Sequence, residues 1–503
     1  MLTRSVAKDL IKRYVYFLVC TQRTLSGGFW FPRSLTITID KLSEDILLEI
    51  FDAYRQLYEL QPHYENFWNS RDGWFKLTHV CQSWRHVVHS SPSRLDVHLL
   101  FTPHRSSRVI MLKSLPPFPI LVDHSFADGI DTGREQGLAL AAIACKNRDR
   151  VHGISLRRKQ HTHMDKLLRA LSYPFPELES LIIGSSYDHD SELILPDTFL
   201  SGSAPSLRRL TLRDVVPRCL PPLLSFTTDL VELCLTIRVP RYALPEASLI
   251  ANLQRLSCLR SLELRLMYTQ LASNFSLTLS EQRDTVPLPN LMQFVFSGQS
   301  RYLEALVVEL ATPRMQYLNA NIGDTAYSFP IPHLCRLICD TNTQFIFVCL
   351  ELLSRQVKFT AETRSGSVHA SAQSFNIIFP ENNISLEEMG NRLSGPLTTV
   401  EELVVIGGMR QVQWRGFFNR IRQVKLIHVS SEVAIGIAHS FRLDGQGIAM
   451  DVLPALEQVK VQVPHIPPLS ENYLNPYLTI PNAFDPLIAA RRRVGRPITL
   501  SFT

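Results

Sequence analysis

The sequence predicts an α/β protein in which a short helical module is followed by an irregular array of parallel strands and helices. Three observations lead to this prediction. Two amphipathic stretches stand near the N-terminus, one apolar phrase recurs through the rest of the chain, and helical segments lie between its copies. With 503 residues and 45% hydrophobic side chains, the chain exceeds the size of one ordinary core and has a globular composition.

Composition narrows the function classes. The net charge of +6 is spread along the chain, so we expect no nucleic-acid partner. The nine cysteines form no CxxC pair, which indicates a reducing intracellular compartment, cytoplasmic or nuclear. No apolar run is long enough to cross a membrane, so we expect no membrane partner. Residues 1–37 are expected to be a poorly ordered extension, although basic residues before the apolar run 14–20 leave a targeting peptide as the alternative.

Residues 38–98 predict the helical module. Ser43 is a suitable N-cap, and Glu44 and Asp45 place negative charge in the first helical turn. The apolar residues that share the first helical face are Leu42, Ile46, Leu47, Ile50, Phe51 and Tyr54. Those at helical spacing in the second stretch are Leu77, Val80, Cys81, Trp84, Val87 and Val88. Ser90, Ser91 and Pro92 end that stretch.

These residues resemble the F-box family. The match consists of Leu42-Ser43-Glu44-Asp45-Ile46-Leu47-Leu48-Glu49-Ile50-Phe51, then Val80-Cys81-Gln82-Ser83-Trp84-Arg85, then Ser91-Pro92. Ser43 stands where the family usually has proline, and the connection between the halves is longer than in the short form of the motif. The run Leu115-Pro116-Pro117-Phe118-Pro119-Ile120 is similar to F-box proteins that are abundant in mushroom-forming fungi.

The resemblance implies docking onto the Skp-type adaptor of a cullin ligase. So small a module cannot bury all of its apolar surface, so a partner groove is expected to cover the remainder. The residues expected to form the adaptor-binding surface are Leu42, Ile46, Leu47, Ile50, Phe51, Val80, Cys81, Trp84 and Val87. The alternative is that these side chains are only the core of a small helical bundle.

A phrase of two apolar residues three positions apart, with a third two positions later, recurs along residues 99–503. Its clearest copies begin at Leu178, Leu207, Leu230, Leu259, Leu291, Met315 and Leu334. Weaker copies begin at Val151, Val400, Ile421 and Leu456. In six copies a proline precedes the phrase by two residues, which favours an extended strand: Pro176, Pro205, Pro289, Pro313, Pro332 and Pro454.

Helical segments are expected between the phrases, so each unit contains a strand and a helix. They are residues 137–145, 164–171, 302–310 and 345–353. One further copy is expected near 356–359 or 375–377, and the Ser-containing stretch 363–374 is interpreted as a loop insertion. Residues 95–101 and 497–502 are expected to supply the first and last strands. The pattern resembles an irregular leucine-rich-repeat solenoid, without the asparagine of regular repeats; the alternative is an ordinary doubly wound α/β domain.

The variable positions of the phrase are expected to face away from the core and to touch a target. The residues chosen for this surface are Arg209, Glu232, Arg260, Glu263, Tyr317 and Arg336. Their mixture of basic and acidic side chains suggests a peptide or protein ligand.

No motif in the chain predicts catalysis or a cofactor. GxGxxG, GxxxxGK[ST], HExxH and GxSxG are all missing from the sequence. Zinc ligation by His152, His161 and His163, or by His333, Cys335 and Cys339, remains a minor alternative. The basic run 491–497 resembles a minor-groove hook but is better explained as a solvated helix end.

We therefore expect a non-enzymatic substrate receptor of a cullin-RING (SCF-type) ubiquitin ligase. In the family, the F-box binds the adaptor and the repeats bind the target, which makes ubiquitin transfer effectively intramolecular. The alternative is a leucine-rich-repeat scaffold that has no link to ubiquitination.

Overall fold

The computed structural model shows a mixed α/β chain with a large, mostly parallel sheet of 16 strands. It describes residues 42–59, 73–92, 94–95, 97–102, 112, 116–124, 132–158, 161–185, 193–218, 220–238, 244–266, 286–323, 331–341, 343–353, 356–363, 373–380, 385–407, 413–442, 451–463 and 476–503. The expected extension 1–37 and nearly all of the expected insertion near 363–374 lie outside these residues. Two compact units are distinguished: residues 1–183 with 196–207, and residues 184–195 with 208–503.

Among the described residues, the first elements of the first unit are the helices α2 (Glu44–Glu59), α3 (Gly73–Leu77) and α4 (Gln82–Ser90), which we call the helical module. Its core is built from both amphipathic stretches. The Phe51 ring meets the Trp84 ring edge to face at 4.8 Å, and both side chains are buried. The other buried apolar side chains of the module are Leu47, Leu48, Tyr54, Trp74, Leu77, Val87 and Val88. The two predicted amphipathic stretches therefore pack against each other.

The helical module continues into the strands of its own unit. The indole N–H of Trp74 donates to the carbonyl of His98 at 3.1 Å. The buried Phe118 ring lies 5.5 Å from the ring of Trp74 and 5.3 Å from that of His89. The module expected at 38–98 thus packs against Phe118, which lies beyond residue 98. Cutting the chain after residue 98 would remove this ring and expose Trp74.

The sheet strands of the first unit follow the order β1-β2-β3-β4, with parallel pairing from β1 to β3. The elements after the module are β1 (Leu99–Phe101), β2 (Ile120–His124), α6 (Thr132–Lys146), the 3-10 turn η4 (Arg148–Arg150), β3 (Val151–Arg158), α7 (His161–Ala170), β4 (Ser180–Ser185) and the 3-10 turn η5 (Phe199–Gly202). All residues of β1 and β2 are buried, so neither face of these strands is open to solvent. Helix α6 comes so close to β2 that a Cβ on Gly137 would lie 2.5 Å from Nε2 of His124.

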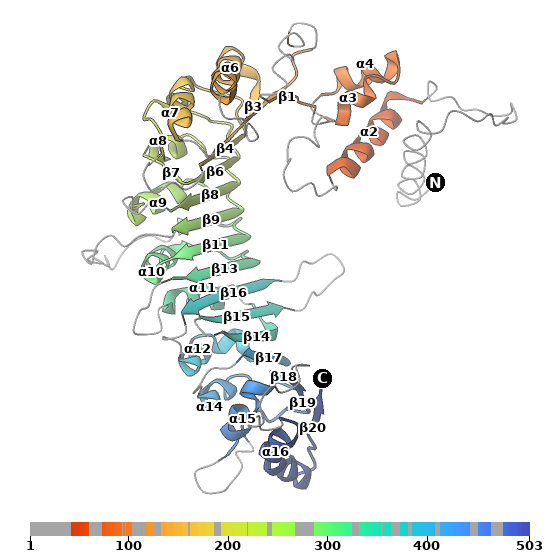
Figure 1. Cartoon of the computed structure of the whole chain (residues 1–503), viewed down its shortest axis with the longest axis vertical. Coiled ribbons are helices and arrows are strands. Elements are labelled where there is room, and N and C mark those ends of the chain that lie inside the picture. The colour runs from red at the N-terminus through yellow and green to blue at the C-terminus, as the bar shows by residue number, and fades with distance from the viewer. Residues whose placement is uncertain are drawn as a thin grey trace, which may run out of the picture. The chain divides into compact units, whose positions relative to one another are not determined.

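The second unit contains twelve strands of the sheet, in the order β6-β8-β9-β11-β13-β16-β15-β14-β17-β18-β19-β20 (Figure 1). These are β6 (Arg209–Arg213), β8 (Glu232–Ile237), β9 (Ser261–Leu266), β11 (Gln293–Gly298), β13 (Tyr317–Ile322), β14 (Phe345–Leu353), β15 (Gln356–Thr363), β16 (Ser374–Pro380), β17 (Glu402–Gly407), β18 (Leu426–Ser430), β19 (Gln458–Gln462) and β20 (Thr499–Phe502). Two short parallel pairs lie outside the sheet: β5 (Leu193–Ile194) with β7 (Val215–Val216), and β10 (Val286–Pro287) with β12 (Leu310–Ala311).

Helices connect most of these strands and lie on one side of the stack in Figure 1. They are α8 (Leu220–Ser225), α9 (Glu246–Leu253), α10 (Ser300–Val307), α11 (Pro332–Asp340), α12 (Leu386–Arg392), α13 (Ser394–Leu397), α14 (Trp414–Phe418), α15 (Ser431–Ser440) and α16 (Pro476–Arg493). The strand residues that face these helices are apolar and buried, as in Leu210 and Leu212 of β6 or Leu262 and Leu264 of β9. The recurring phrase thus has the burial that its alternation predicts.

One backbone arrangement recurs between parallel strands of the second unit. The carbonyl of Arg208 accepts hydrogen bonds from the N–H groups of both Val231 and Glu232, at 2.8 and 2.9 Å. The carbonyls of Val231, Arg260, Met292, Glu401 and Lys425 each accept two consecutive N–H groups of the next strand in the same way. These segments therefore share one local geometry, which explains why the same apolar phrase recurs in the sequence.

Strands β14, β15 and β16 interrupt the parallel order. β14 pairs antiparallel with β15, which pairs antiparallel with β16, while β16 is parallel to β13 and β14 is parallel to β17. After β13 the chain therefore first forms β14, the strand of this group farthest from β13, and then returns through β15 to β16, which lies beside β13. The expectation of a wholly parallel array is wrong here, although both segments suggested for the further repeat, 356–359 and 375–377, are strands.

Three expectations for individual elements are wrong. Leu334, Leu337 and Cys339 lie on helix α11, whose first residue is Pro332, so this proline starts a helix instead of a strand. Residues 345–353 form strand β14 and not a helix. The phrase expected from Ile421 begins instead at Val424, because Val424, Ile427 and Val429 are buried while Leu426 is half-exposed.

The basic run at the end of α16 is only partly the solvated helix end that the sequence predicts. Arg492 and Arg493 are exposed, as expected. Arg491 is instead fully buried, and its guanidinium donates to the carbonyls of Val452, Leu453 and Pro454 at 2.9, 2.9 and 3.0 Å. This arginine therefore ties α16 to the segment that leads into β19.

A carboxylate links helices α10 and α11. The Glu304 side chain accepts the N–H groups of His333 and Leu334, at 2.7 and 3.0 Å, in the first turn of α11. Burial raises the pKa of Glu304 to about 7, although these N–H groups and Arg392 oppose the rise. The carboxylate thus satisfies two donors that a helix start leaves without intrahelical partners.

We expect Glu304→Gln to make the stability of the chain less dependent on pH. Because the folded chain holds this proton to a higher pH than the unfolded chain, native Glu304 lowers stability as pH rises from about 4.5 to about 7. The free energy of unfolding of the variant relative to the native chain should rise by about 1–2 kcal/mol from pH 5 to pH 8, allowing for solvent screening. Urea unfolding at four pH values measures this, with exposed Glu432→Gln as control. A constant difference across the range would contradict the role of Glu304.

Candidate protein-interaction surfaces

The residues from Val80 to Arg85 have separate structural roles in the helical module. Cys81 is the N-cap of α4, and its Sγ lies 3.5 Å from the backbone nitrogen of Trp84, whose N–H it accepts. A spacing of three residues is the one that lets an N-cap side chain reach an N–H of the first turn. The Trp84 ring is buried in the core, and the Arg85 Nε donates to the Thr78 carbonyl at 2.9 Å. Cys81, Trp84 and Arg85 thus set the turn between α3 and α4.

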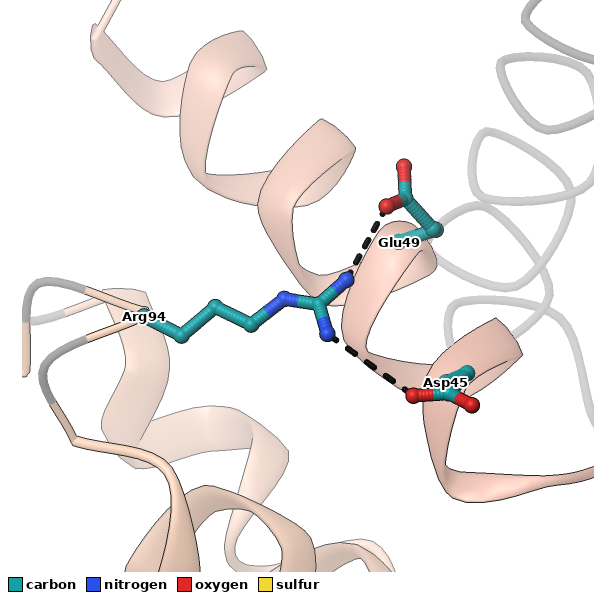
Figure 2. A network of polar contacts seen from close by, with 3 residues as sticks. All are labelled: Asp45, Glu49 and Arg94. Atoms are coloured by element: carbon teal, nitrogen blue, oxygen red, sulfur yellow. Dashed lines mark hydrogen bonds and ion pairs between the residues drawn. The ribbon is translucent and has the colours of Figure 1, made fainter.

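Arg94 connects the chain after α4 to helix α2. Figure 2 shows its guanidinium between Glu49 and Asp45, with nitrogen–oxygen distances of 3.0 and 3.8 Å. Both carboxylates are well exposed, so solvent screening limits each ion pair to less than about 1 kcal/mol. Arg94 therefore orients α2 but does not hold the module together.

The structure divides the residues predicted to bind an adaptor into three groups. Leu47, Phe51, Trp84 and Val87 are buried in the module core. Leu42, Ile50 and Cys81 are half-buried. Ile46 and Val80 are 49% and 56% exposed. Only the second and third groups can touch a partner without opening the core. Because the Cys81 thiol caps α4, the remaining residues, Leu42, Ile46, Ile50 and Val80, define what we call the module's apolar surface.

The second candidate surface is the side of the sheet in the second unit that the helices do not cover, which we call the open face. Strand residues alternate between buried side chains and side chains that reach solvent on this face. Backbone register aligns the outward positions into rows that cross all twelve strands. The central row consists of Thr211, Cys234, Glu263, Val295, Asn319, Asn376, Thr360, Cys349, Val404, His428, Lys460 and Ser501.

Five of the six residues predicted to touch a target lie on the open face or at its edge. Arg209 and Glu232 form an ion pair of 3.5 Å across β6 and β8. Glu263 and Tyr317 point outward from β9 and β13, and Arg260 is exposed just before β9. The prediction for Arg336 is wrong, because it lies on helix α11 and approaches Asp340 one turn away at 4.0 Å.

Arg213 and Arg265 on the same face were not predicted from the sequence. Each follows the last apolar residue of its phrase by one position, where strands β6 and β9 continue. Extending the alternation by one residue would have identified both. The repeating phrase also does not predict which strands have a solvent-exposed face. Strands β1 and β2 of the first unit are buried throughout and have none.

The central row of the open face includes two thiols. Burial raises the pKa of Cys234, the central thiol of β8, to about 11, so this thiol stays protonated and weakly nucleophilic at neutral pH. Among the described residues, no three His, Cys, Asp or Glu side chains are arranged to hold a metal ion. His333, Cys335 and Cys339 share helix α11, and the side chains of His161 and His163 lie outside the described residues.

The comparisons with known proteins leave the family open. No model of a protein family matches the chain, and no curated protein matches its sequence. In the part of the chain that the structure describes, no helix has the length and apolar character that spanning a membrane requires. What the structure itself offers is a helical module with an exposed apolar surface in one unit and an open sheet face in the other.

Proposed function

We propose that the chain is the substrate-recognition subunit of a cullin-RING (SCF-type) ubiquitin ligase. In this proposal residues 38–98 act as an F-box that binds the Skp-type adaptor. Residues 99–503 act as an irregular leucine-rich-repeat solenoid whose open face binds the target protein. The chain itself catalyses nothing, since the ubiquitin-transferring residues belong to other subunits, and it works in the cytoplasm or the nucleus.

The observation that carries the proposal is the division of apolar side chains in the helical module. The module has a formed core around Phe51 and Trp84, yet Ile46 and Val80 remain about half exposed. Because α2 and α4 already pack against each other, the exposed side chains do not serve the internal core. Because each side chain is already about half buried, covering the rest of it contributes roughly 0.7–1.5 kcal/mol, half the value for full burial. Several such residues together can anchor a docking surface.

The open face supports the second half of the proposal. Its rows run across twelve parallel or antiparallel strands at roughly 4.8 Å per strand, which gives an extended surface suited to a protein segment. Its polar and charged side chains do not suit a lipid. A binding protein with two such surfaces can join a target to a ligase without any catalytic group of its own.

We expect Ile46→Glu and Val80→Glu, made separately in the full chain, each to weaken adaptor binding at least about tenfold, because each buries an unpaired charge in the interface. Circular dichroism and thermal unfolding should stay close to those of the native chain, because both sites are exposed. Pulldown with a purified Skp-type adaptor measures binding.

Matched controls are Ile435→Glu and Val494→Glu, which alter side chains that are 37% and 62% exposed in the second unit. They should leave adaptor binding unchanged. If the native chain does not bind the adaptor or co-purify with cullin-ligase subunits, the chain is a repeat scaffold without a link to ubiquitination. Equal binding by the native chain and both module variants would move the adaptor site elsewhere.

A further inference from the structure

Charge is distributed unevenly along the open face. Strands β6, β8 and β9, together with the residue that precedes β6 and the residue that precedes β9, carry five arginines and two glutamates, a net charge of +3. The arginines are Arg208, Arg209, Arg213, Arg260 and Arg265, and the glutamates are Glu232 and Glu263. This end of the face, which we call the arginine end, therefore has a positive potential of its own.

Only two of these arginines are neutralised within the face. Arg209 pairs with Glu232 at 3.5 Å, and Arg265 pairs with Glu263 at 2.6 Å. Arg208, Arg213 and Arg260 are exposed and have no carboxylate partner among the described residues. Three exposed guanidinium groups thus have no carboxylate partner and can meet an incoming anion, although that of Arg213 also lies beside the Cys234 thiol.

The three available arginines are spread over an area. The Arg208 carbonyl accepts the Val231 N–H, and the Val231 carbonyl accepts the Arg260 N–H, both at 2.8 Å. Arg208 and Arg260 are therefore two strands apart along one edge of the face, or roughly 10 Å between their backbones. Arg213 lies at the other end of β6, roughly 16 Å along the strand from Arg208. Groups so far apart match several carboxylates better than one phosphate.

The next three strands of the face, β11, β13 and β16, carry no charged side chain, and their outward side chains are mostly polar, with Val295 and Ile378 among the exceptions. Their outward side chains include Gln293, Ser297, Tyr317, Asn319, Asn321, Ser374 and Asn376. The Nδ2 of Asn319 lies 3.4 Å from the Tyr317 hydroxyl, and the remaining amides can donate or accept. Tyrosine, serine and asparagine together form adaptable surfaces for peptide recognition, as they do in antibody paratopes.

The far part of the face is charged in a different way. Lys358 pairs with Glu351 at 2.6 Å, His428 lies 3.2 Å from Glu402, and Lys425 lies 3.4 Å from Glu401. These three basic groups each have an acidic neighbour, whereas Lys460 has no ion pair with a described residue. The strands from β14 to β20 other than β16, with the residues that precede β17, β18 and β19, nevertheless carry five glutamates against three lysines, so this part offers little attraction to an anionic ligand. An acidic ligand is therefore expected at the arginine end and on the polar strands beside it.

We propose that the arginine end binds a peptide segment that carries several aspartate or glutamate side chains. Its carboxylates contact Arg208, Arg213 and Arg260, and its flanking residues lie on β11, β13 and β16. This rests on the proposed function only in that such a segment is then the recognition element of the ligase target; the binding chemistry stands independently.

The test uses the full chain and three labelled peptides of about twelve residues. One carries six glutamates separated by serine and glycine, the second has glutamine at those six positions, and the third has one phosphoserine among the glutamines. Fluorescence anisotropy should detect binding of the first peptide only, and raising the salt from low to physiological ionic strength should weaken it several-fold. Arg208→Glu combined with Arg260→Glu should weaken it at least about tenfold.

The matched control is Arg336→Glu, an exposed arginine on helix α11 away from the open face. It should leave binding of the acidic peptide within about twofold. Equal binding by the native chain and the Arg208/Arg260 double variant would overturn the proposal. Preference for the phosphoserine peptide would show that the surface binds a phosphorylated partner instead of carboxylates, and would overturn the proposal as well.

Adaptor pulldown on the same variants separates this inference from the proposed function. Loss of peptide binding with intact adaptor binding in the double variant supports the arginine end as a separate surface. Failure of the native chain to bind any peptide, with the adaptor still bound, defeats the inference and leaves the ligase proposal standing. Peptide binding by a native chain that does not bind the adaptor supports the inference and defeats the ligase proposal.

Discussion

Trp84→Ala should unfold the helical module and abolish adaptor binding together. The Trp84 ring is buried and its centroid lies 4.8 Å from that of the Phe51 ring, so its removal leaves a cavity between α2 and α4. Truncating a buried tryptophan typically costs about 3–5 kcal/mol, which is comparable with the whole stability of so small a module. Loss of near-ultraviolet dichroism and new protease cleavage within 42–98 would show the unfolding.

Strands β6 to β20 should keep their hydrogen-exchange protection in this variant. Each strand of the second unit is held by its sheet neighbours, so stability there is close to a sum of neighbour terms. Loss of protection across the whole chain would contradict this. Adaptor binding within about twofold of native would contradict the assignment of Trp84, since 1.4 kcal/mol already changes an affinity tenfold.

Trp84→Phe is the matched control for this experiment. The indole N–H of Trp84 is buried and has no acceptor among the described residues. Phenylalanine keeps an aromatic ring against Phe51 and removes that unsatisfied donor, so a smaller loss of about 1–2 kcal/mol is expected. Together with Ile46→Glu, this separates the residues that hold the module from those that bind its partner.

The strands of the second unit were largely predictable because their signal is local. Leu210 and Leu212, or Leu262 and Leu264, alternate with more exposed residues so that one side of the strand is apolar. An alternation of period two with one buried face specifies a half-exposed strand whatever its distant neighbours are. The same reasoning located four of the face residues from spacing alone: Arg209, Glu232, Glu263 and Tyr317.

Helix α11 and strand β14 were interchanged for a physical reason. Leu334 and Leu337 are three residues apart, which suits a helix face as well as the repeating phrase, and Pro332 is compatible with either. Phe345 to Leu353 is apolar almost without interruption, so it has no period that could separate strand from helix. Its aromatic and β-branched residues were the available signal for a strand.

Pairing and exposure could not be read from the sequence because both depend on distant residues. The antiparallel return of β14, β15 and β16 is decided by which strands find one another, and no local pattern records that choice. In the helical module Ile46 and Leu47 are neighbours in one apolar run, yet one is exposed and the other buried. Only the packing of α4 on α2 distinguishes them.

Gly407→Ala should destabilise the second unit more than the same substitution at Gly495 or Gly395. Gly407 ends β17 with φ at +96°, and a Cβ at this position would lie 2.0 Å from the carbonyl oxygen of Leu352 on β14. The Gly407 N–H also donates a hydrogen bond to the Ser430 hydroxyl at 3.1 Å, and this hydroxyl donates to the Gly407 carbonyl at 3.2 Å. The backbones of β14 and β17 must therefore separate, for which we expect a loss of about 3 kcal/mol or more.

The two other glycines serve as controls that separate backbone strain at positive φ from a steric clash of the added Cβ. Gly495 has φ at +74°, and an added Cβ would meet no atom within 4 Å, so Gly495→Ala should cost only the left-handed conformation, about 1–2 kcal/mol. Gly395 has neither a positive φ nor a neighbour within 4 Å, so Gly395→Ala should be neutral or slightly stabilising. Urea unfolding of the three variants should rank the losses Gly407, Gly495, Gly395. If Gly407→Ala costs no more than Gly495→Ala, the close approach of β17 to β14 is wrong, and with it the point at which the antiparallel strands rejoin the parallel order.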